Sequence, residues 1–314
     1  MPERYVIALG GNALIPPGGR GTAEEQTRTA MVRLAPLVAS GAQVLITHGN
    51  GPQVGNLLLK NELAAELVPP MPLDWCVAQT QATIGLAIQT ALEWELRQRE
   101  VARGVVVVLT RVVVDPLDPG RMRYTKPVGR HLSAEEAHQR ADESHRYAEQ
   151  PDGKWRRVVP SPEPVAVLEE GEIRQLLEAG TTVVAAGGGG VPVEAGADGR
   201  YFGVEAVIDK DLTASLLARR LGADALVILT DAPGAAVNFG RADQRLLGRV
   251  TPQIVRGFQA AGHFSEGSMG PKVEAALRFV EGGGKRAVIA FLEDATAAIA
   301  GDAGTQIMGA RHAG

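Results

Sequence analysis

The sequence predicts an α/β fold with a mainly parallel sheet covered by helices on both faces. Short apolar runs of strand length alternate with longer segments of helical periodicity along the chain. The runs are continuously apolar, which is typical of parallel strands buried on both sides. At 314 residues, 45% of them hydrophobic, the chain is long enough to bury one large core or two lobes.

The predicted elements follow one another in order. Strands are expected at 5–10, 42–49, 105–110, 181–186, 224–231 and 286–294. Thr22 and Glu25, three residues later, form a capping box that predicts a helix from there to Ser40. Further helices are expected at about 74–103 and from Leu212, Thr251 and Ser268.

One segment interrupts this alternation. Between Asp115 and Pro164 the chain is charged and rich in proline, and its helical stretch from Ser133 to about Tyr147 is polar almost all round. Such a helix cannot lie in a core, so we expect a flap or small subdomain that stands off the sheet. His138 and His145, seven residues apart, form either a metal-ligand pair or part of a solvated face.

Composition and charge exclude several classes of protein. The net charge of −4 argues against a nucleic-acid partner. Cys76 is the single cysteine, so no internal disulfide can form and a reducing cytosol fits. The first apolar run is too short for a signal peptide, and no run approaches the length of a membrane span. We therefore expect a cytoplasmic protein with no membrane partner.

Three glycine-rich loops follow predicted strands. They are GGNAL at Gly10–Leu14, HGNGPQVG at His48–Gly55 and GGGG at Gly187–Gly190. Ligands bind beyond the carboxyl ends of strands in open parallel sheets, and glycines let backbone N–H groups approach an anion. A single such loop is often a plain turn, but three at equivalent positions indicate a shared anion site. His48 either lines that site or shapes its turn.

None of these loops matches a standard nucleotide-binding signature. The pattern GxxxxGK[ST] is absent. Pro52 stands where a dinucleotide-binding fingerprint needs an open turn, and the glycine loop, HRD and DFG set of protein kinases is missing as well.

Lysine is rare in this chain, with six among 32 basic residues. Lys210 stands between Asp209 and Asp211 where an apolar run turns into a helix. Asp211 is either a plain helix cap beside a solvated lysine or an acid that holds a phosphate-binding lysine. Lys272 stands at another predicted helix start, and Lys126 lies in the flap. Phosphoryl transfer needs cations on the phosphates and an in-line arrangement, which these parts supply.

These motifs together resemble the carbamate kinases of the amino acid kinase family. The matching strings occur in that family's order almost end to end: ALGGNAL, THGNGPQVGN, TKPVG, WRRVVPSPEP, GGGGVPV, GVEAVIDKDL and GSMGPKVEAALRFVEGGGKRAVI. One departure is Pro233–Gly234, inserted shortly after the strand that ends in LTD. The resemblance implies a three-layer αβα sandwich with a small protruding polar subdomain.

The resemblance also implies a reaction and a division of the chain. Residues 1–180 would form an N-terminal lobe for carbamate, with a lid subdomain at about 117–164, and residues 181–314 a C-terminal lobe for the nucleotide. The reaction would be reversible phosphoryl transfer between ATP and carbamate, giving ADP and carbamoyl phosphate, with Mg²⁺ accompanying the nucleotide. In arginine catabolism it runs toward ATP. Members of the family are homodimers.

Roles for single residues follow from the same resemblance. Lys210 and Lys272 would contact the transferring group and Asp211 would orient them. Lys126 would reach the phosphates only when the lid closes, and before closure it would lie far from both lysines or on a flap of raised mobility. Asp209 would be a solvated neighbour. The acceptor and phosphoryl side would use Gly10, Gly11, Asn12, Gly49, Asn50, Gly51, Gly188 and Gly189. The nucleotide side would use Asp231, Met269, Gly270 and Lys272. No protein ligand to a metal is expected.

Two other functions remain open on the sequence. The same fold acts on other small acceptors in acetylglutamate and UMP kinases, although those relatives lack the TKPVG excursion. A non-catalytic, nucleotide-binding regulator of arginine catabolism is the second alternative. The presence of all three lysines and Asp211 argues against it.

Overall fold

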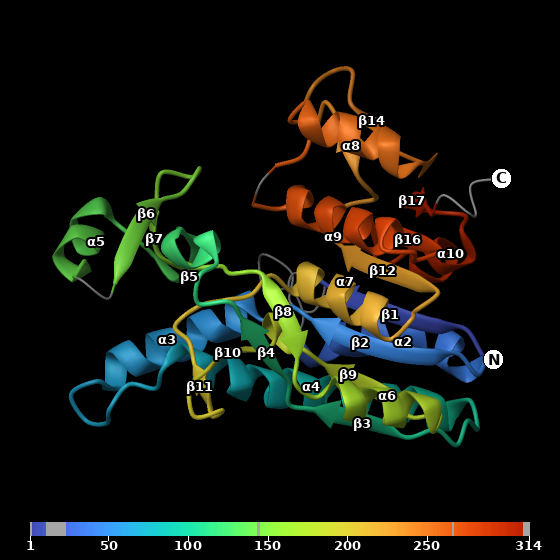
Figure 1. The fold of residues 1–314 in the computed structure, drawn as a ribbon, viewed down its shortest axis with the longest axis horizontal. Helices are drawn as coiled ribbons and strands as arrows, with labels where there is room; N and C mark the ends of the chain where they lie inside the picture. Colours follow the sequence, from blue (N-terminus) through green and yellow to red (C-terminus); the bar gives the residue numbers. More distant parts are fainter. Residues whose placement is uncertain (1, 11–22, 143–144, 266, 310–314) are drawn as a thin grey trace.

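The computed structural model describes residues 2–10, 23–142, 145–265 and 267–309 of the chain (Figure 1). Its helices are α2 (Ala23–Ala39), α3 (Gly51–Ala64), α4 (Leu73–Gln98), α5 (Ala134–Arg140), α6 (Glu170–Glu178), α7 (Lys210–Arg220), α8 (Pro252–Ala260), α9 (Met269–Glu281) and α10 (Ala295–Ala300). Two short 3-10 turns are η1 (Pro119–Met122) and η2 (Gly187–Gly189).

The largest sheet confirms the predicted α/β class. Its eight strands lie in the order β15 (Arg249–Val250), β17 (Thr305–Met308), β16 (Arg286–Phe291), β12 (Ala225–Thr230), β1 (Arg4–Leu9), β2 (Gln43–His48), β9 (Thr182–Ala185) and β3 (Val105–Val108). Neighbouring strands of this sheet are parallel except β16 and β17. β9 lies between β2 and β3, so the sheet is continuous across residue 180.

The described residues also form three smaller sheets. A four-stranded sheet has the order β11 (Tyr201–Gly203), β10 (Val191–Ala195), β4 (Arg111–Val114) and β8 (Pro164–Val167). A three-stranded sheet has the order β5 (Tyr124–Leu132), β7 (Trp155–Pro160) and β6 (Arg146–Glu149). A two-stranded sheet pairs β13 (Ala236–Val237) with β14 (Arg245–Leu246).

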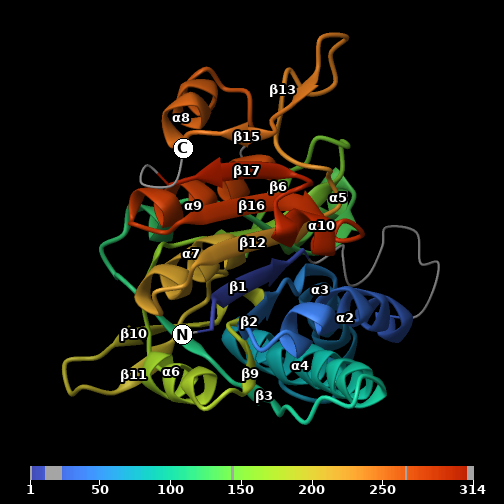
Figure 2. The ribbon, with the colours of Figure 1, turned by 90° about the vertical axis from the view of Figure 1, so that its right-hand side faces the viewer.

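Helices cover both faces of the large sheet and make three layers (Figures 1 and 2). Successive side chains of β1 point to opposite faces. Val6 and Ala8 join a core cluster with residues of α6, α7 and α9, whereas Ile7 and Leu9 join one with residues of α2, α4 and α10. Both faces of β1 are therefore buried, which explains its continuous apolar run.

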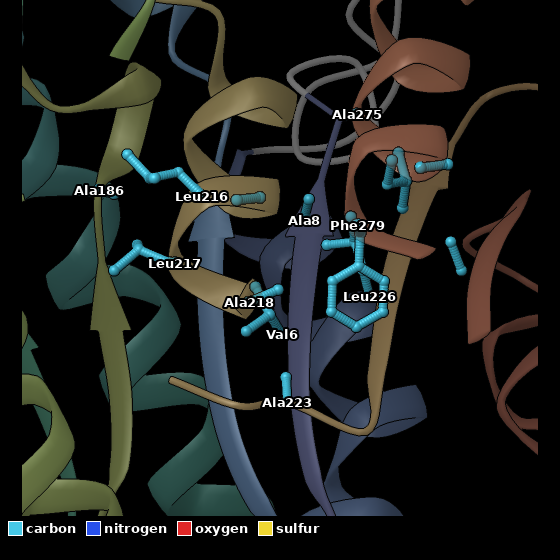
Figure 3. Close-up of a cluster of buried hydrophobic side chains, with 14 of the residues drawn as sticks. Val6, Ala8, Ala186, Leu216, Leu217, Ala218, Ala223, Leu226, Ala275 and Phe279 are labelled. Atoms are coloured by element: carbon cyan, nitrogen blue, oxygen red, sulfur yellow. The ribbon is translucent and has the colours of Figure 1, made fainter. Parts of the chain in front are cut away.

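The first of these clusters joins helices α7 and α9. Figure 3 shows side chains from β1, α7 and α9 meeting over the sheet. Leu217 of α7 and Phe279 of α9 are almost fully buried there. Packing on a common strand layer fixes the starts of α7 and α9 relative to each other.

The three-stranded sheet and α5 form the predicted protruding subdomain, called the lid below (Figure 1). Its outer surface is polar, but Val128 of β5 and Val159 of β7 are buried against Val54 and Leu58 of α3. The lid therefore shares a small apolar core with the body of the molecule, in contrast to its polar sequence.

The predicted helix from Ser133 to Tyr147 is too long. Ser133 does cap α5, in a capping box with Glu136, but the helix ends at Arg140 and β6 follows. Residues of β6 pair with β7, which satisfies their backbone groups in a sheet instead. His138 and His145 consequently do not share a helix. The ring centroids of His138 and Trp155 lie 5.0 Å apart and His145 contacts Asp142, so the shared helical face on which the metal pair depended is not formed.

Other boundaries differ by a few residues. α4 ends at Gln98 rather than Arg103, because Glu100 has a positive φ of 55° and leaves the helical path. The expected strand at 105–110 is shorter and ends at Val108. Thr22, half of the predicted capping box of α2, lies outside the described residues. None of the described helices combines the length and apolar surface that a bilayer crossing requires.

Candidate active site

A cleft of about 300 Å³ lies beyond the carboxyl ends of β1, β2 and β12. This edge is where open parallel sheets usually bind their ligands. Most of the predicted site residues line it: Gly10, Gly49, Asn50, Gly51, Lys126, Gly188, Lys210, Asp211, Asp231 and Lys272. Loops far apart in the sequence therefore meet around one space, as the three glycine motifs predicted.

Asp211 holds two ammonium groups in this cleft. Its Oδ1 accepts a hydrogen bond of 2.5 Å from Lys210 Nζ, and its Oδ2 accepts one of 3.0 Å from Lys272 Nζ. The side chain of Asp211 is 3% exposed, and those of Lys210 and Lys272 are 11% and 14% exposed. Water therefore screens these charges only weakly. One carboxylate joins the beginnings of α7 and α9.

Burial and mutual attraction set the protonation of the trio. Burial favours the neutral acid, but the two lysines outweigh it and lower the pKa of Asp211 to about 2. At Lys272 burial opposes the charge, and Asp211 outweighs it and raises the pKa. Burial lowers the pKa of Lys210, and repulsion from Lys272 adds to this effect. Two ammonium groups share one carboxylate, so the trio offers surplus positive charge to an anion.

Asp209 caps α7, so the interpretation of Asp211 as the cap of this helix is wrong. The helix begins at Lys210, two residues before the expected start. Asp209 Oδ1 accepts hydrogen bonds from the N–H groups of Asp211 at 2.9 Å and Leu212 at 3.4 Å. These are donors that the first turn of a helix leaves unpaired. The aspartate directly before the lysine is the sequence signal for this cap.

Asp209 also binds Lys126 of the lid. The Nζ of Lys126 lies 2.9 Å from Oδ2 of Asp209, whose side chain is 12% exposed. Asp209 is therefore not the solvated neighbour that was expected. Lys126 lines the same cleft as Lys210 and Lys272, so the structure does not place it far from the other two lysines.

Two glycines of the GGGG motif make room for polar side chains of the second loop. A Cβ on Gly187 would lie 2.3 Å from His48 Nε2, and one on Gly188 would lie 2.1 Å from Asn50 Nδ2. Asn50 Nδ2 in turn donates a hydrogen bond of 2.9 Å to Thr80 Oγ1 on α4. The loops after β2 and β9 are thus packed too closely to admit a side chain at either glycine.

His48 is buried behind this contact. Burial lowers its pKa to about 4, and the nearby charge of Lys210 acts in the same direction. Its Nδ1 lies 3.0 Å from the carbonyl oxygen of Gly49, which can only accept, so the neutral ring carries its hydrogen on Nδ1. Its contact with Gly187 and its burial favour the turn-shaping alternative for His48.

A second cavity of about 650 Å³ adjoins the first. Asp231 and Ser268 line both spaces, and Met269 and the inserted Pro233–Gly234 line the second. Sequence reasoning missed the remainder of this wall, which includes Phe239. Its ring is largely exposed on a segment rich in polar residues, and an aromatic residue in such surroundings was the available signal.

Two predicted residues line neither cavity in the described part of the chain. The carbonyl of Gly189 accepts a hydrogen bond from a threonine of α7. The N–H of Gly270 donates to the carbonyl of Ser265 over 2.8 Å where α9 begins. Both shape the backbone beside the site. Gly11 and Asn12 lie outside the described residues.

Comparisons with known proteins converge on one family. The model of the amino acid kinase family matches residues 3–290. The carbamate kinase of Pyrococcus horikoshii is 46% identical over 313 residues, which cover 98% of this chain and 99% of that protein. Carbamate kinase 2 of Enterococcus faecalis is 43% identical over 294 residues, covering 92% of this chain and 94% of that protein.

A solved structure extends the likeness to the fold. The carbamate kinase from Giardia lamblia bound to AMP-PNP has a TM-score of 0.91 and 37% identity, and 98% of each chain is covered. Similarity of this extent shows that the chain has the same three-layer architecture and belongs to the same enzyme class, the kinases, which transfer phosphoryl groups. The chain belongs to the amino acid kinase family and, within it, to the carbamate kinases.

Proposed function

We propose that the protein transfers a phosphoryl group between ATP and carbamate, giving ADP and carbamoyl phosphate, and that it works in both directions. The observation that carries this proposal is Asp211 between Lys210 and Lys272 in a glycine-lined cleft. Phosphoryl transfer requires cations around the transferred group and little covalent catalysis by the protein. The names of the relatives support carbamate as the acceptor.

The two lysines act on the moving group as it passes between donor and acceptor. An ammonium group has three N–H donors, and the bond to Asp211 engages one donor of each lysine. The remaining donors can reach phosphoryl oxygens, where charge develops during transfer. Asp211 stays ionised because of its low pKa, so it orients both cations throughout.

The glycine loops contribute in two ways. The N–H groups of Gly10 and Gly49 already donate to carbonyls of neighbouring strands, so these glycines admit the acceptor by leaving space. Asn50 and Gly51 stand at the N-terminus of α3, beside its unpaired first-turn N–H groups. A helix N-terminus attracts anions, so this end of α3 supports a carboxylate-like acceptor or a phosphate.

In this proposal the acceptor and the nucleotide bind to different parts of the chain. Residues 1–180, with the lid at about 117–164, serve the acceptor, and residues 181–314 serve the nucleotide. The 650 Å³ cavity, lined by Asp231 and Met269, has room for a nucleoside next to the lysine cleft. The AMP-PNP bound to the relative from Giardia lamblia supports a nucleotide site in this fold.

Mg²⁺ accompanies the nucleotide in this proposal and neutralises phosphate charge. Among the described residues no three His, Cys, Asp or Glu side chains are grouped to hold a metal. Mg²⁺ commonly keeps waters and phosphate oxygens and uses only one or two carboxylates. Asp231, which lines both cavities, is the carboxylate placed to contribute.

We further propose a cytoplasmic homodimer that makes ATP from carbamoyl phosphate during arginine catabolism. The family resemblance and the single, buried Cys76 support this view. Trp75, Leu86 and Trp94 of α4 are exposed and offer an apolar surface to a second copy. Light scattering on a sizing column measures the mass of the assembly, and a monomer at micromolar concentration would refute the dimer.

The proposed reaction is tested by following ATP formation from ADP with three phosphoryl donors in parallel. Carbamoyl phosphate is expected to give the fastest turnover, ahead of acetyl phosphate and acetylglutamyl phosphate. Preference for acetylglutamyl phosphate would assign the fold to another acceptor. ADP binding without turnover on any donor would favour a non-catalytic regulator.

A further inference from the structure

We propose that Asp209 is a positioning residue that holds Lys126 of the lid at the phosphoryl cleft and couples the lid to the start of α7. The inference rests on the proposed function, which makes this cleft the place of transfer. Asp209 uses its two oxygens for different purposes. Oδ1 accepts the cap hydrogen bonds of α7, and Oδ2 accepts Lys126 Nζ at 2.9 Å.

A cap alone would not need the second contact. One side-chain oxygen satisfies the first-turn N–H groups of a helix, and a neutral asparagine does this as well as an aspartate. The charge of Asp209 is matched instead by an ammonium group 83 residues earlier in the chain, on a different subdomain. The pair joins the lid to the start of α7, two parts of the molecule that are distant in the chain.

The same carboxylate touches the catalytic trio through the main chain. The N–H that Oδ1 accepts at 2.9 Å belongs to Asp211, whose side chain holds Lys210 and Lys272. All three lysines of the cleft are therefore connected through two neighbouring aspartates. Lys126 spends one of its three N–H donors on Asp209 and keeps the others for a phosphoryl oxygen.

Two other ion pairs of the lid lie at its base, around a different cavity. Arg140 of α5 pairs with Glu62 of α3 at 2.9 Å, and Arg157 of β7 pairs with Glu205 at 2.5 Å. These residues surround a separate cavity at the base of the lid. They dock the lid on α3, but they do not contact Lys126, so they leave the position of its ammonium group to Asp209.

Asp209→Asn tests the proposal because it keeps the cap and removes the charge. It is combined with Lys126→Met in a double-mutant cycle, and Glu62→Gln serves as the matched control at the lid's base. We expect Asp209→Asn to lower kcat about tenfold with Lys126 present and by less than about twofold in the Lys126→Met background. Glu62→Gln is expected to combine additively with Lys126→Met.

Two kinetic results would overturn the proposal. Equal losses from Asp209→Asn in both backgrounds would make Asp209 independent of Lys126. Coupling of Glu62→Gln as strong as that of Asp209→Asn would assign the positioning to lid docking in general.

A second readout does not depend on turnover. Hydrogen exchange of residues 124–132 in the ligand-free protein is expected to be faster in Asp209→Asn than in the unsubstituted protein, at an unchanged melting temperature. Unchanged exchange would overturn the proposal that Asp209 holds Lys126 at the cleft. If the unsubstituted protein makes no ATP from carbamoyl phosphate, the proposed function fails, and this exchange measurement still decides the role of Asp209.

Discussion

Lys272 on α9 donates a hydrogen bond of 3.0 Å to Asp211 on α7, a residue 61 positions earlier. The two helices pack on the same face of the sheet, so the bond links their first turns directly above the strand ends. Because Lys210 shares the carboxylate, removal of Asp211 would leave two buried ammonium groups without their hydrogen-bonded counter-charge. Uncompensated buried charge is costly, so we expect the loss of this carboxylate to disturb the two ammonium groups.

Asp211→Asn is expected to lower kcat at least ~100-fold while the protein still folds. Asn cannot orient two ammonium groups, but the cap of α7 survives because Asp209 supplies it. Kinetics of ATP formation and a melting curve measure the two effects. Asp224→Asn is the matched control, since Asp224 binds Lys285 at 2.5 Å on the protein surface, and it should leave kcat unchanged. Normal turnover in Asp211→Asn would reduce this residue to a structural role.

Lys210→Ala is expected to lower kcat at least ~100-fold, because a preorganised cation at the moving phosphoryl group is worth several kcal/mol. ADP affinity, measured by calorimetry, should fall far less. Lys285→Ala removes an exposed lysine and serves as the control. If ADP affinity collapsed while kcat stayed the same, Lys210 would belong to nucleotide binding and not to transfer.

Local patterns in the sequence predicted those parts of the fold that depend on neighbours in the chain. The continuous apolar runs predicted buried parallel strands, and the glycine motifs after them predicted where the cleft opens. The apolar pattern predicts that α7 begins at Leu212, its first apolar residue, and this boundary is wrong by two residues. The structure begins the helix at Lys210 and moves the cap to Asp209.

These local patterns could not predict contacts between segments that are distant in the sequence. Nothing near Asp209 in the sequence indicates a partner 83 residues away in the lid. Val128 and Val159 of the lid look isolated in a charged segment, yet they complete a core with α3. Such pairings depend on how the lid docks, and sequence periodicity describes only one element at a time.

His48 predicts a pH dependence of stability. Its pKa is about 4 when folded and about 6.5 in an unfolded chain. Between these values the unfolded state binds a proton that the folded state does not. The free energy of unfolding therefore falls as the pH drops from about 6.5 to about 4, by up to about 3 kcal/mol from this group. Urea unfolding across this pH range measures the slope.

His48→Asn should remove that contribution, because an amide does not titrate in this pH range. The amide N–H can still donate to the carbonyl of Gly49. His131→Asn, at an exposed position of the lid, is the control and should keep the slope of the unsubstituted protein. An identical slope in His48→Asn and in the unsubstituted protein would show that another group governs this range.

The cap of α7 predicts a difference between two substitutions of Asp209. Asp209→Ala removes both cap hydrogen bonds and should lower the free energy of unfolding by about 1 kcal/mol. Asp209→Asn keeps an accepting oxygen at the same place and should change it by less than about 0.5 kcal/mol. Chemical denaturation distinguishes the two. Equal destabilisation by Ala and Asn would mean that the charge, not the cap, stabilises this end of the helix.

Gly188→Ala is expected to lower both stability and activity, and a second glycine separates the two causes of this effect. Gly188 has a φ of +67° and Gly222 a φ of +64°, so alanine at either position adopts a left-handed backbone, at a cost of about 1 kcal/mol. A Cβ at Gly222 meets nothing within 4 Å, whereas one at Gly188 would lie 2.1 Å from Asn50 Nδ2. Only Gly188→Ala must therefore displace Asn50 from Thr80 and from the cleft.

We expect Gly222→Ala to lower the free energy of unfolding by about 1 kcal/mol with normal kcat. Gly188→Ala should lower it further and should turn over at least ~10-fold more slowly. Similar stability and similar kcat in the two variants would show that the contact between the loops after β2 and β9 does not shape the site.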